Sequence, residues 1–405
     1  MKIKRIIKII ITVVVLLVLA LWIKSRWHAW FSSPAETEFS YTAIPDRVTL
    51  TPGENFVSER TISWRCDTML HESHLLLAVN GDTSIIKADG EEVISRGGKD
   101  IFYHAILSDL KPNTQYSYSV VTGSKQSQWY LINIPGAYND RKIVYVGDVQ
   151  DTIGGNSHNL YSKLYKEHAD ATFWAFGGDL IEAPIDRYWK YLYSCVDSTF
   201  ANVPIVCATG NHEYLKTAYR TLDPRWTKNF VYPDNGANLA KGKSYYIKDD
   251  NILMIVFDTN GLQDVLSVSS EYQWLRKTLQ EEGAGKWKIV MFHHPIYSVR
   301  AKRNNYLIRN TFEPLIEKYG VHLVLQGHEH GYASKISNKS GKNYPIYIIS
   351  HASPKSYKAA THKDGMKIVP NRKMYQVIKI SKERLQYNAF DLETDSILDN
   401  ITITK

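Results

Sequence analysis

Residues 205–213 read Ile-Val-Cys-Ala-Thr-Gly-Asn-His-Glu, and residues 321–330 read Val-His-Leu-Val-Leu-Gln-Gly-His-Glu-His. Each stretch begins with a short apolar run typical of a buried strand and ends, after a glycine, in polar side chains. A glycine at this point lets the chain turn sharply and leaves room beside the polar groups. Both stretches therefore predict strands that carry metal-ligating side chains at their carboxyl ends.

Three further apolar runs end in the same way: Ile143–Val146 before Gly147-Asp148, Thr172–Phe176 before Gly177-Gly178-Asp179, and Ile289–Phe292 before His293-His294-Pro295. One such cluster alone is a common structural feature, but five are difficult to explain by chance. Ligands of layered α/β domains collect at the carboxyl ends of strands, so the five clusters should converge. They contain carboxylates, an amide and imidazoles but no thiolate, a set that suits two cations such as iron, manganese or zinc.

From Lys142 onward, apolar runs alternate with amphipathic stretches, which predicts an α/β layered domain over residues 140–405. Leu253–Phe257 is one more expected strand of this domain. The expected helices are Leu160–His168, Arg187–Val196, Glu271–Glu281 and Thr311–Tyr319. Ser270 and Gln273 have the spacing of a capping box, so we expect the third helix to begin there.

Residues 44–135 have a different pattern, in which short β-prone runs recur between turn signals with no helical stretch. This pattern predicts an all-β sandwich. The expected strands are Arg47–Thr51, Thr61–Cys66, His74–Val79, Tyr103–Leu107, Gln115–Val121 and Gln128–Ile134. The segment Leu110–Tyr116 resembles the corner of fibronectin type III domains in which a tyrosine hydroxyl bonds the backbone. Tyr116 would supply that hydroxyl here.

The N-terminal segment is apolar from Ile9 to Ile23 except for Thr12, and it comes directly after a basic cluster. With Ile6 and Ile7 the run approaches the length needed to cross a bilayer. We expect residues 1–31 to be a transmembrane signal-anchor with a cytoplasmic N-terminus, followed by a polar linker over residues 32–43. A cleaved signal peptide has the same layout and is the alternative. In both cases we expect the rest of the chain, which we call the body, to be exported. In the first case it is anchored on the non-cytoplasmic side of the membrane.

The formal net charge is +8, from 49 Lys and Arg against 41 Asp and Glu. The chain up to Ala35 holds six of these basic residues and no acid, so residues 36–405 have 43 basic against 41 acidic residues, a net of +2. A nearly balanced body argues against nucleic acid as a partner. The three cysteines, Cys66, Cys195 and Cys207, show no metal-binding spacing and predict buried free thiols.

The order Asp, Asp, Asn-His, His, His-x-His resembles that of the calcineurin-like metallophosphoesterases and, among them, the purple acid phosphatases. The resemblance runs from about residue 45 to the C-terminus and includes the preceding sandwich, with Trp64 and the Tyr103-His104-Ala105 stretch. It implies a four-layer β-sandwich flanked by helices as the catalytic domain.

The resemblance also implies a role for each cluster. Asp148 and His330 would bind the first metal, and Asp179 would bridge both metals. Asn211, His293 and His328 would bind the second metal. The centre would combine iron with zinc, manganese or a second iron. The implied reaction is hydrolysis of a small phosphate monoester by in-line attack of a metal-bound hydroxide, with His212 as the general acid.

The sequence departs from the family in three places. Purple members have a tyrosine where this chain has Glu182, and many other relatives have Asp-x-His where this chain has Gln150. Either residue could bind the first metal, or instead form a hydrogen bond to a metal-bound water. Phosphate-binding histidines are replaced by a segment with three cations, Arg300, Lys302, Arg303 and the neighbouring Asn304. This segment contacts phosphate or is simply an exposed charged loop. We interpret His294 as structural or as a support for the ligands.

Two other functions remain compatible with the sequence. A phosphodiesterase or nucleotide hydrolase would use the same metal site and differ only at the substrate rim. A catalytically weak binding or adhesion module would use the sandwich as its working part, although the complete set of expected ligands argues against this.

Overall fold

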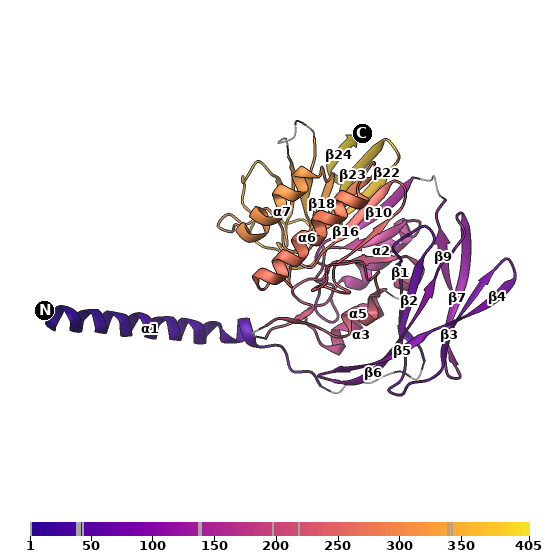
Figure 1. Ribbon diagram of the computed structural model, residues 1–405, viewed down its shortest axis with the longest axis horizontal. Helices are drawn as coiled ribbons and strands as arrows, with labels where there is room; N and C mark the ends of the chain where they lie inside the picture. Colours follow the sequence, from indigo (N-terminus) through magenta and orange to yellow (C-terminus); the bar gives the residue numbers. More distant parts are fainter. Residues whose placement is uncertain are drawn as a thin grey trace.

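The computed structural model describes residues 2–37, 42, 44–136, 140–196, 198–217, 219–337, 341 and 343–405. The chain forms a projecting N-terminal helix, an all-β domain and a larger domain in which helices cover β-sheets (Figure 1). The expected order of parts is therefore correct, while the end of the predicted linker, residues 38–41 and 43, lies outside the described residues.

The all-β domain is a sandwich of two antiparallel sheets, with strand orders β1-β2-β6-β5 and β4-β3-β7-β8, and β9 paired to β7. Its strands are β1 (Asp46–Pro52), β2 (Arg60–Arg65), β3 (Ser73–Val79), β4 (Asp82–Lys87), β5 (Asp89–Ser95), β6 (Gly98–Leu107), β7 (Thr114–Thr122), β8 (Lys125–Gln126) and β9 (Tyr130–Ile134). The hydroxyl of Tyr116 accepts a hydrogen bond from the backbone N–H of Lys111 at 2.9 Å, as the corner motif predicts.

The larger domain contains two mixed sheets, with strand orders β12-β11-β10-β22-β23-β24 and β15-β16-β17-β18-β20-β19-β21. In the first sheet β10, β11 and β12 run parallel to one another. In the second, β16, β17, β18 and β20 are parallel. The strands are β10 (Arg141–Val146), β11 (Phe173–Phe176), β12 (Ile205–Cys207), β13 (Tyr214–Leu215), β14 (Thr221–Leu222), β15 (Tyr245–Lys248), β16 (Ile252–Val256), β17 (Trp287–Met291), β18 (Leu323–Gln326), β19 (Tyr332–Ile336), β20 (Ile346–Ile349), β21 (Lys367–Val369), β22 (Met374–Ile380), β23 (Arg384–Asp391) and β24 (Ile397–Thr404).

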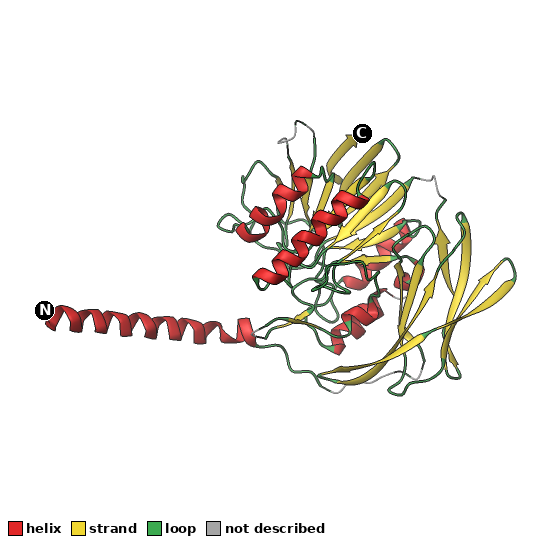
Figure 2. Cartoon of the chain, viewed as in Figure 1, coloured by secondary structure: helices red, strands yellow, loops and turns green. Residues whose placement is uncertain are grey.

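Helices cover the outer faces of both sheets, which gives the expected four layers (Figure 2). The residues of β17 and Phe292, which directly follows it, show this arrangement, because successive side chains of a strand point to opposite faces. Ile289 and Met291 belong to the core that the two sheets share, whereas Val290 and Phe292 pack in the separate core that includes residues of α6 and α7. The helices are α2 (Ser157–His168), α3 (Asp186–Val196), α4 (Thr199–Asn202), α5 (Trp226–Asn229), α6 (Val265–Glu282) and α7 (Tyr306–Lys318).

Two predicted helix starts are wrong. Helix α6 begins at Val265, and its capping box is formed by Asp264 and Ser267 rather than by Ser270 and Gln273. Helix α7 begins at Tyr306, five residues before Thr311, and includes Pro314. The error in α6 arises because an aspartate with a serine three residues later satisfies the same two backbone groups as the predicted pair.

Helix α1 (Lys2–Phe31) projects away from the rest of the molecule (Figure 1). Within residues 3–28, an 18-residue stretch has a mean hydropathy of 3.1, and none of this stretch is buried against the protein. Helix α1 is long and apolar enough to cross a membrane. All three cysteines are buried, as the sequence predicts.

Candidate metal centre

The five strand-end clusters meet at one edge of the two inner sheets. Asp148 follows β10, Asp179 follows β11, and Asn211 with His212 follows β12. From the other sheet, His293 follows β17, and His328 and His330 follow β18. These strands run parallel within their sheets, so their carboxyl ends lie side by side and bring the polar groups together.

Asp148, Asp179 and His330 form the first of two clusters, with one ligand atom of each within 4.8 Å of the others. The Nδ1 of His330 donates to the backbone oxygen of Lys355 at 3.1 Å, which leaves Nε2 with its lone pair directed inward. Both carboxylate oxygens of Asp148 are buried and have no hydrogen-bond partner among the described residues. Buried carboxylate oxygens without a partner are costly unless a cation binds them.

Asp179, His293 and His328 form the second cluster, again with ligand atoms within 4.8 Å. The Nδ1 of His293 donates to the backbone oxygen of Gly177 at 2.8 Å. The Nε2 of His293 lies 3.2 Å from Oδ1 of Asn211 and 3.2 Å from Nδ1 of His328. Asp179 belongs to both clusters, so five of the six expected ligands form two adjoining clusters that share one carboxylate, and Asn211 contacts the second cluster through His293.

The electrostatics of the clusters favour positive charge. Burial raises the pKa of Asp148 well above its ordinary value. Burial acts the same way on Asp179, but the facing His293 and His212 outweigh it and lower its pKa. Burial would lower the pKa of His293, yet the carboxylate of Asp179 raises it to about 9. The carboxylates thus stabilise a positive charge placed between them.

The backbone at the centre is held in uncommon conformations. Asp179, His328 and His330 have φ angles of 55°, 71° and 43°, in the left-handed region that non-glycine residues seldom adopt. Gly178 has a φ of 96°, and a Cβ there would lie 2.7 Å from Nδ1 of His293. A Cβ on Gly210 would lie 2.1 Å from Oδ1 of Asp179. Such strain persists where the surrounding structure enforces it, which is common at functional sites.

Glu213 enforces this geometry, and the sequence did not assign it a role. Its fully buried carboxylate accepts hydrogen bonds from the backbone N–H groups of Asp179 at 3.0 Å and Leu180 at 2.7 Å. It also accepts from Ile181 at 3.3 Å and Gly210 at 2.7 Å. One side chain therefore fixes the turns after both β11 and β12.

His212 is tied to the same two turns. Its backbone N–H donates to Oδ1 of Asp179 at 2.8 Å, and its Nδ1 donates to the backbone oxygen of Glu182 at 2.5 Å. The side chain of Glu182 pairs with Lys355. Glu182 therefore positions His212 through its carbonyl group, while its carboxylate is engaged by a lysine.

Gln150 reaches the first cluster directly. Its Nε2 lies 3.1 Å from Nε2 of His330 and 3.4 Å from Oδ2 of Asp179, and its Oε1 is buried with no hydrogen-bond partner among the described residues. The two ends of a glutamine amide are assigned from surrounding hydrogen bonds. When the amide oxygen and nitrogen of Gln150 are assigned the other way round, the oxygen points toward the space between Asp179 and His330.

Of the charged residues in the segment after His293, Arg303 contacts the centre. Its Nη2 lies 2.9 Å from Nε2 of His328, and its Nε lies 3.2 Å from Oε1 of Glu329. Lys302 and Asn304 are exposed, as an ordinary charged loop would be. His294 forms a 3.0 Å hydrogen bond with the hydroxyl of Thr259 and packs against His328, at 4.3 Å between ring centroids.

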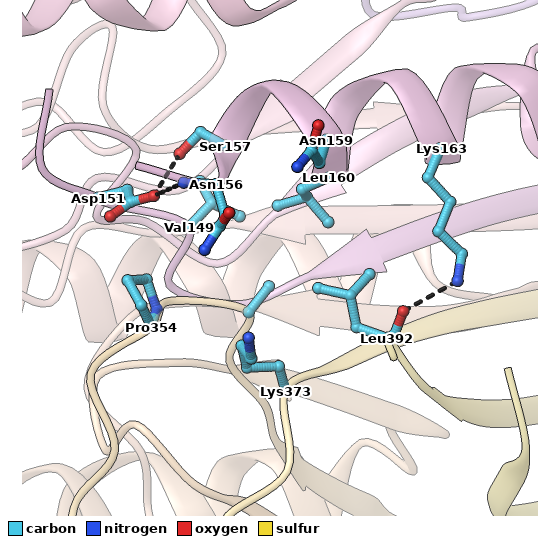
Figure 3. A pocket seen from close by; sticks show the side chains of 11 residues that line it. Val149, Asp151, Asn156, Ser157, Asn159, Leu160, Lys163, Pro354, Lys373 and Leu392 are labelled. Carbon is cyan, nitrogen blue, oxygen red and sulfur yellow. Dashed lines mark hydrogen bonds between the residues drawn. The ribbon is translucent and has the colours of Figure 1, made fainter. Parts of the chain in front are cut away.

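A pocket beside the centre is bordered by Val149, Asp151, Lys163, Pro354 and Lys373 with neighbouring residues of α2 (Figure 3). Its charged groups are already engaged. Asp151 accepts from the backbone N–H of Asn156 at 2.5 Å, just before α2, and Lys163 donates to the backbone oxygen of Leu392 at 2.9 Å. The unpartnered polar atoms of Asp148 and Gln150 instead lie in the metal-ligand clusters, which makes those clusters the candidate site.

Family models match both domains. Residues 141–332 match the calcineurin-like phosphoesterase model, and residues 45–133 match the N-terminal domain of purple acid phosphatases. Purple acid phosphatase 15 from Arabidopsis thaliana is 24% identical over 286 residues, covering 62% of this chain and 53% of that protein. The Fe(3+)-Zn(2+) purple acid phosphatase 12 of the same plant is 25% identical over 276 residues, covering 61% and 58%. The chain thus matches just over half the length of these relatives.

The fold is also similar to a solved structure, the purple acid phosphatase PPD1 isolated from yellow lupin seeds. The TM-score is 0.72 at 17% sequence identity, and the match covers 90% of this chain and 75% of that one. The similarity therefore includes both the sandwich and the larger domain.

Proposed function

The chain belongs to the calcineurin-like phosphoesterases and has the N-terminal domain of the purple acid phosphatases, and from this we propose that it is a metal-dependent phosphatase acting on phosphate monoesters. The observation that carries the proposal is the pair of three-residue clusters that share Asp179. Two neighbouring cations form the core of many enzymes that hydrolyse phosphate esters.

The donor set supports the assignment of each ligand. We assign Asp148 and His330 to the first cation, with Asp179 as the bridge. Asn211, His293 and His328 complete the site of the second. Oxygen and imidazole donors suit iron with zinc, manganese or a second iron. When bound, two such cations supply an acidified water as nucleophile and positive charge that neutralises the phosphate oxygens.

Gln150 supports the first cation better than Glu182. Its side chain already lies among the ligand atoms, with 3.1 Å between its Nε2 and Nε2 of His330. Glu182 is engaged by Lys355 and occupies the position where purple relatives have tyrosine. We therefore expect the iron-loaded protein to lack a tyrosinate-to-iron absorption band in the visible spectrum.

His212 is the proposed proton donor to the leaving group. Its Nδ1 is fixed by the backbone oxygen of Glu182, so Nε2 is the ring nitrogen left to act on a substrate. The protonated ring would give the Nε2 proton to the departing alkoxide, as general acids do. Arg303 and Lys355, near opposite sides of the centre, offer positive charge to the phosphate oxygens.

The N-terminal helix is the proposed membrane anchor. It carries Lys4, Arg5 and Lys8 at its start and no acidic residue, which favours a cytoplasmic N-terminus and a catalytic domain on the far side of the membrane. Removal of the same segment as a signal peptide would instead release the body into the exported space.

The first test compares hydrolysis of an aryl phosphate with that of a bis-aryl phosphate by the full chain, alongside metal analysis. We expect the monoester to be preferred and about two metal ions per chain. Preference for the diester would change the substrate class to phosphodiesters. A protein that stays inactive and free of metal under varied iron, zinc and manganese supply would contradict the enzyme proposal.

Substitutions test the two central roles. Asp179→Asn should abolish activity and lower the metal content, because it removes the shared charge. His212→Ala should retain metal and lose activity about 10²- to 10⁴-fold toward the aryl phosphate. His158→Ala, at an exposed histidine on α2, is the matched control. A His212→Ala rate equal to that of this control would refute the general-acid role.

A further inference from the structure

The segment that follows α1 is bound to the body rather than free. The side chain of Glu36 is only 2% exposed, and its carboxylate accepts from Nη1 of Arg225 at 2.5 Å and from the backbone N–H of Asp186 at 2.6 Å. The backbone oxygen of Pro34 accepts from Arg96 at 2.8 Å. These contacts fix the point at which the chain leaves the anchor.

A fourth contact brings this segment close to the metal centre. The hydroxyl of Ser33 accepts from the backbone N–H of Lys216 at 2.8 Å. Lys216 is the fourth residue after His212, and four residues of chain span at most about 14 Å. The backbone of His212, the proposed proton donor, therefore lies within about 14 Å of the backbone of Lys216, the residue that Ser33 contacts.

The attachment point is itself close to the bilayer surface if α1 spans the membrane. The apolar run ends at Ile23, and the eight helical residues from there to Phe31 add about 12 Å at 1.5 Å per residue. The headgroup layer beyond the hydrocarbon is roughly 5–8 Å thick. Ser33, two residues past the helix, thus lies within roughly 15 Å of the lipid phosphates.

The edge of the larger domain that carries the metal centre faces the side of the molecule from which α1 projects. Helix α6 follows β16 after residues 257–264, and α7 follows β17 after residues 292–305. The left-hand ends of both helices lie on the side from which α1 projects (Figure 1). Tyr219 joins the hairpin β13–β14 to the start of α6 by donating to Asp264 at 2.8 Å. The Ser33 contact and the start of α6 are thus parts of one continuous edge.

Large apolar side chains project from this edge. Val265 and Leu266 at the start of α6 are 83% and 72% exposed, and Tyr219 is 60% exposed. Tyr306 and Leu307 at the start of α7 are 64% and 56% exposed. We call these five residues the apolar rim. Exposed apolar side chains grouped in this way mark surfaces that contact a membrane or another partner.

Basic residues accompany the apolar rim. The segments 214–222, 295–306 and 354–363 contribute Lys216, Arg220, Arg300, Lys302, Arg303, Lys355, Lys358 and Lys363, and none of the three contains an acidic residue. Arg303 pairs with Glu329 and Lys355 with Glu182, so the local positive charge comes from the other six basic residues. Apolar side chains combined with Lys and Arg are the composition of surfaces that lie on anionic lipid headgroups.

We propose that the apolar rim rests on the bilayer in which α1 is anchored, and that the substrate is a phosphate monoester carried by a lipid of that surface. This inference rests on the proposed phosphatase function. In the reaction, water adds to phosphorus and the bond between phosphorus and the lipid oxygen breaks. His212 gives its proton to that oxygen, so the products are the lipid alcohol and inorganic phosphate.

Substrate presentation gives the first test. The full chain, loaded with metal and reconstituted in phosphatidylcholine vesicles, is given long-chain phosphatidic acid in the same vesicles, a short-chain water-soluble phosphatidic acid, or an aryl phosphate. We expect kcat/KM for the vesicle-borne substrate to exceed that for the short-chain one at least 10-fold. Equal values would show that the site accepts the soluble headgroup without the surface and would overturn the proposal. Hydrolysis of none of the three would instead overturn the proposed function.

Acidic substitutions in the apolar rim, compared with one on the opposite side of the body, give the second test. Val265→Asp with Leu266→Asp places charge where the rim would meet lipid, in a first helical turn that tolerates acids. We expect at least a 10-fold loss on vesicle-borne phosphatidic acid and less than a 2-fold change on the aryl phosphate. Ile85→Asp, at a 70% exposed residue of β4 on the opposite side of the body (Figure 1), should change neither rate. Equal effects of the rim and control variants would refute the proposal.

Orientation is measured without catalysis. The three native cysteines are buried, so Leu266→Cys and Ile85→Cys can each be labelled selectively with a fluorophore. Lipids with a nitroxide on the headgroup should quench the label at position 266 strongly and the label at position 85 little. Equal quenching at the two positions would place the rim away from the membrane and overturn the inference.

Discussion

Glu213 positions two turns of the metal centre through backbone contacts alone. Its carboxylate accepts from four N–H groups, two of them at 2.7 Å, and it does not itself belong to either ligand cluster. Such supporting hydrogen bonds orient metal ligands and influence metal affinity. Glu213 is therefore a positioning residue for Asp179.

Replacing Glu213 by glutamine tests this role. Glutamine has one acceptor oxygen and turns an NH₂ group toward two of the four N–H groups, which then lose their partner. We expect the free energy of unfolding to fall by about 1–3 kcal/mol and metal affinity to fall about 10- to 100-fold. Denaturant unfolding and metal titration measure the two effects. Glu92→Gln, at a half-exposed glutamate of β5, is the control, and equal metal affinity in the two variants would contradict the positioning role.

The sequence located the ligand candidates but not their supports. Strand-end motifs place Asp148, Asp179 and His293 because backbone topology alone determines where strand ends meet. The contacts of Gln150 and Arg303 depend on side-chain directions, which are set by tertiary packing and which no local pattern encodes. Glu213 directly follows the Asn-His pair after β12. Only the fold reveals that its carboxylate accepts hydrogen bonds from the backbone of the turn after β11.

Among the elements, α6 links the outer helical layer to the segment before β15 through a buried acid. Glu271 lies on its inner face, 3% exposed, and its Oε1 accepts from the hydroxyl of Ser244 at 2.5 Å. Its Oε2 is buried without a hydrogen-bond partner among the described residues. Burial raises the pKa of Glu271 to about 8, so the folded protein holds this side chain protonated at neutral pH.

This raised pKa predicts how stability depends on pH. The unfolded carboxyl titrates near pH 4.5, so folding takes up a proton between about pH 4.5 and pH 8, and this group lowers stability as pH rises through that window. Glu271→Gln removes the titration. The free energy of unfolding of the variant should equal that of the wild type near pH 4.5. Above that pH it should exceed the wild-type value by up to roughly 1.4 kcal/mol per pH unit. Urea unfolding at pH 5 and pH 8 measures the difference. Glu281→Gln, 57% exposed on the same helix, should show none, and a constant offset for Glu271→Gln would contradict the prediction.

Element prediction located strands with continuous apolar runs, but it missed exposed strands and also some buried ones, such as β20 and β22. The strands β10, β17 and β18 were placed to within a few residues because their apolar runs are continuous. Strands β4 and β5 were missed, since nearly all their residues are exposed and Ile85 and Ile94 point to solvent. An edge strand of this kind is held by its ladder of backbone hydrogen bonds, so its sequence carries no core pattern.

At the scale of the whole molecule, buried polar contacts join the sandwich to the catalytic domain. The hydroxyl of Tyr118 donates to the backbone oxygen of Ala201 at 2.6 Å, and that of Thr49 bonds the hydroxyl of Tyr193 at 2.6 Å. An ion pair of 2.6 Å joins Arg47 to Asp186. The sequence predicted two domains but not this interface. The residues that meet there are more than 80 positions apart, and the sequence pattern of each domain gives no sign that it contacts the other.

The Arg47–Asp186 pair is the most testable part of this interface. The two side chains are 1% and 4% exposed, and the nearest other cations to Asp186 are Arg65 at 3.6 Å and Arg225 at 3.7 Å. Arg47→Ala leaves a buried carboxylate without its closest partner, which should lower the free energy of unfolding by about 3–5 kcal/mol. Arg187→Ala, at the exposed neighbour on α3, should cost less than about 0.5 kcal/mol. Calorimetry measures both. Activity per folded molecule should stay unchanged in both variants, since neither residue contacts the metal centre. Equal unfolding free energies would mean that the buried pair contributes nothing to holding the domains together.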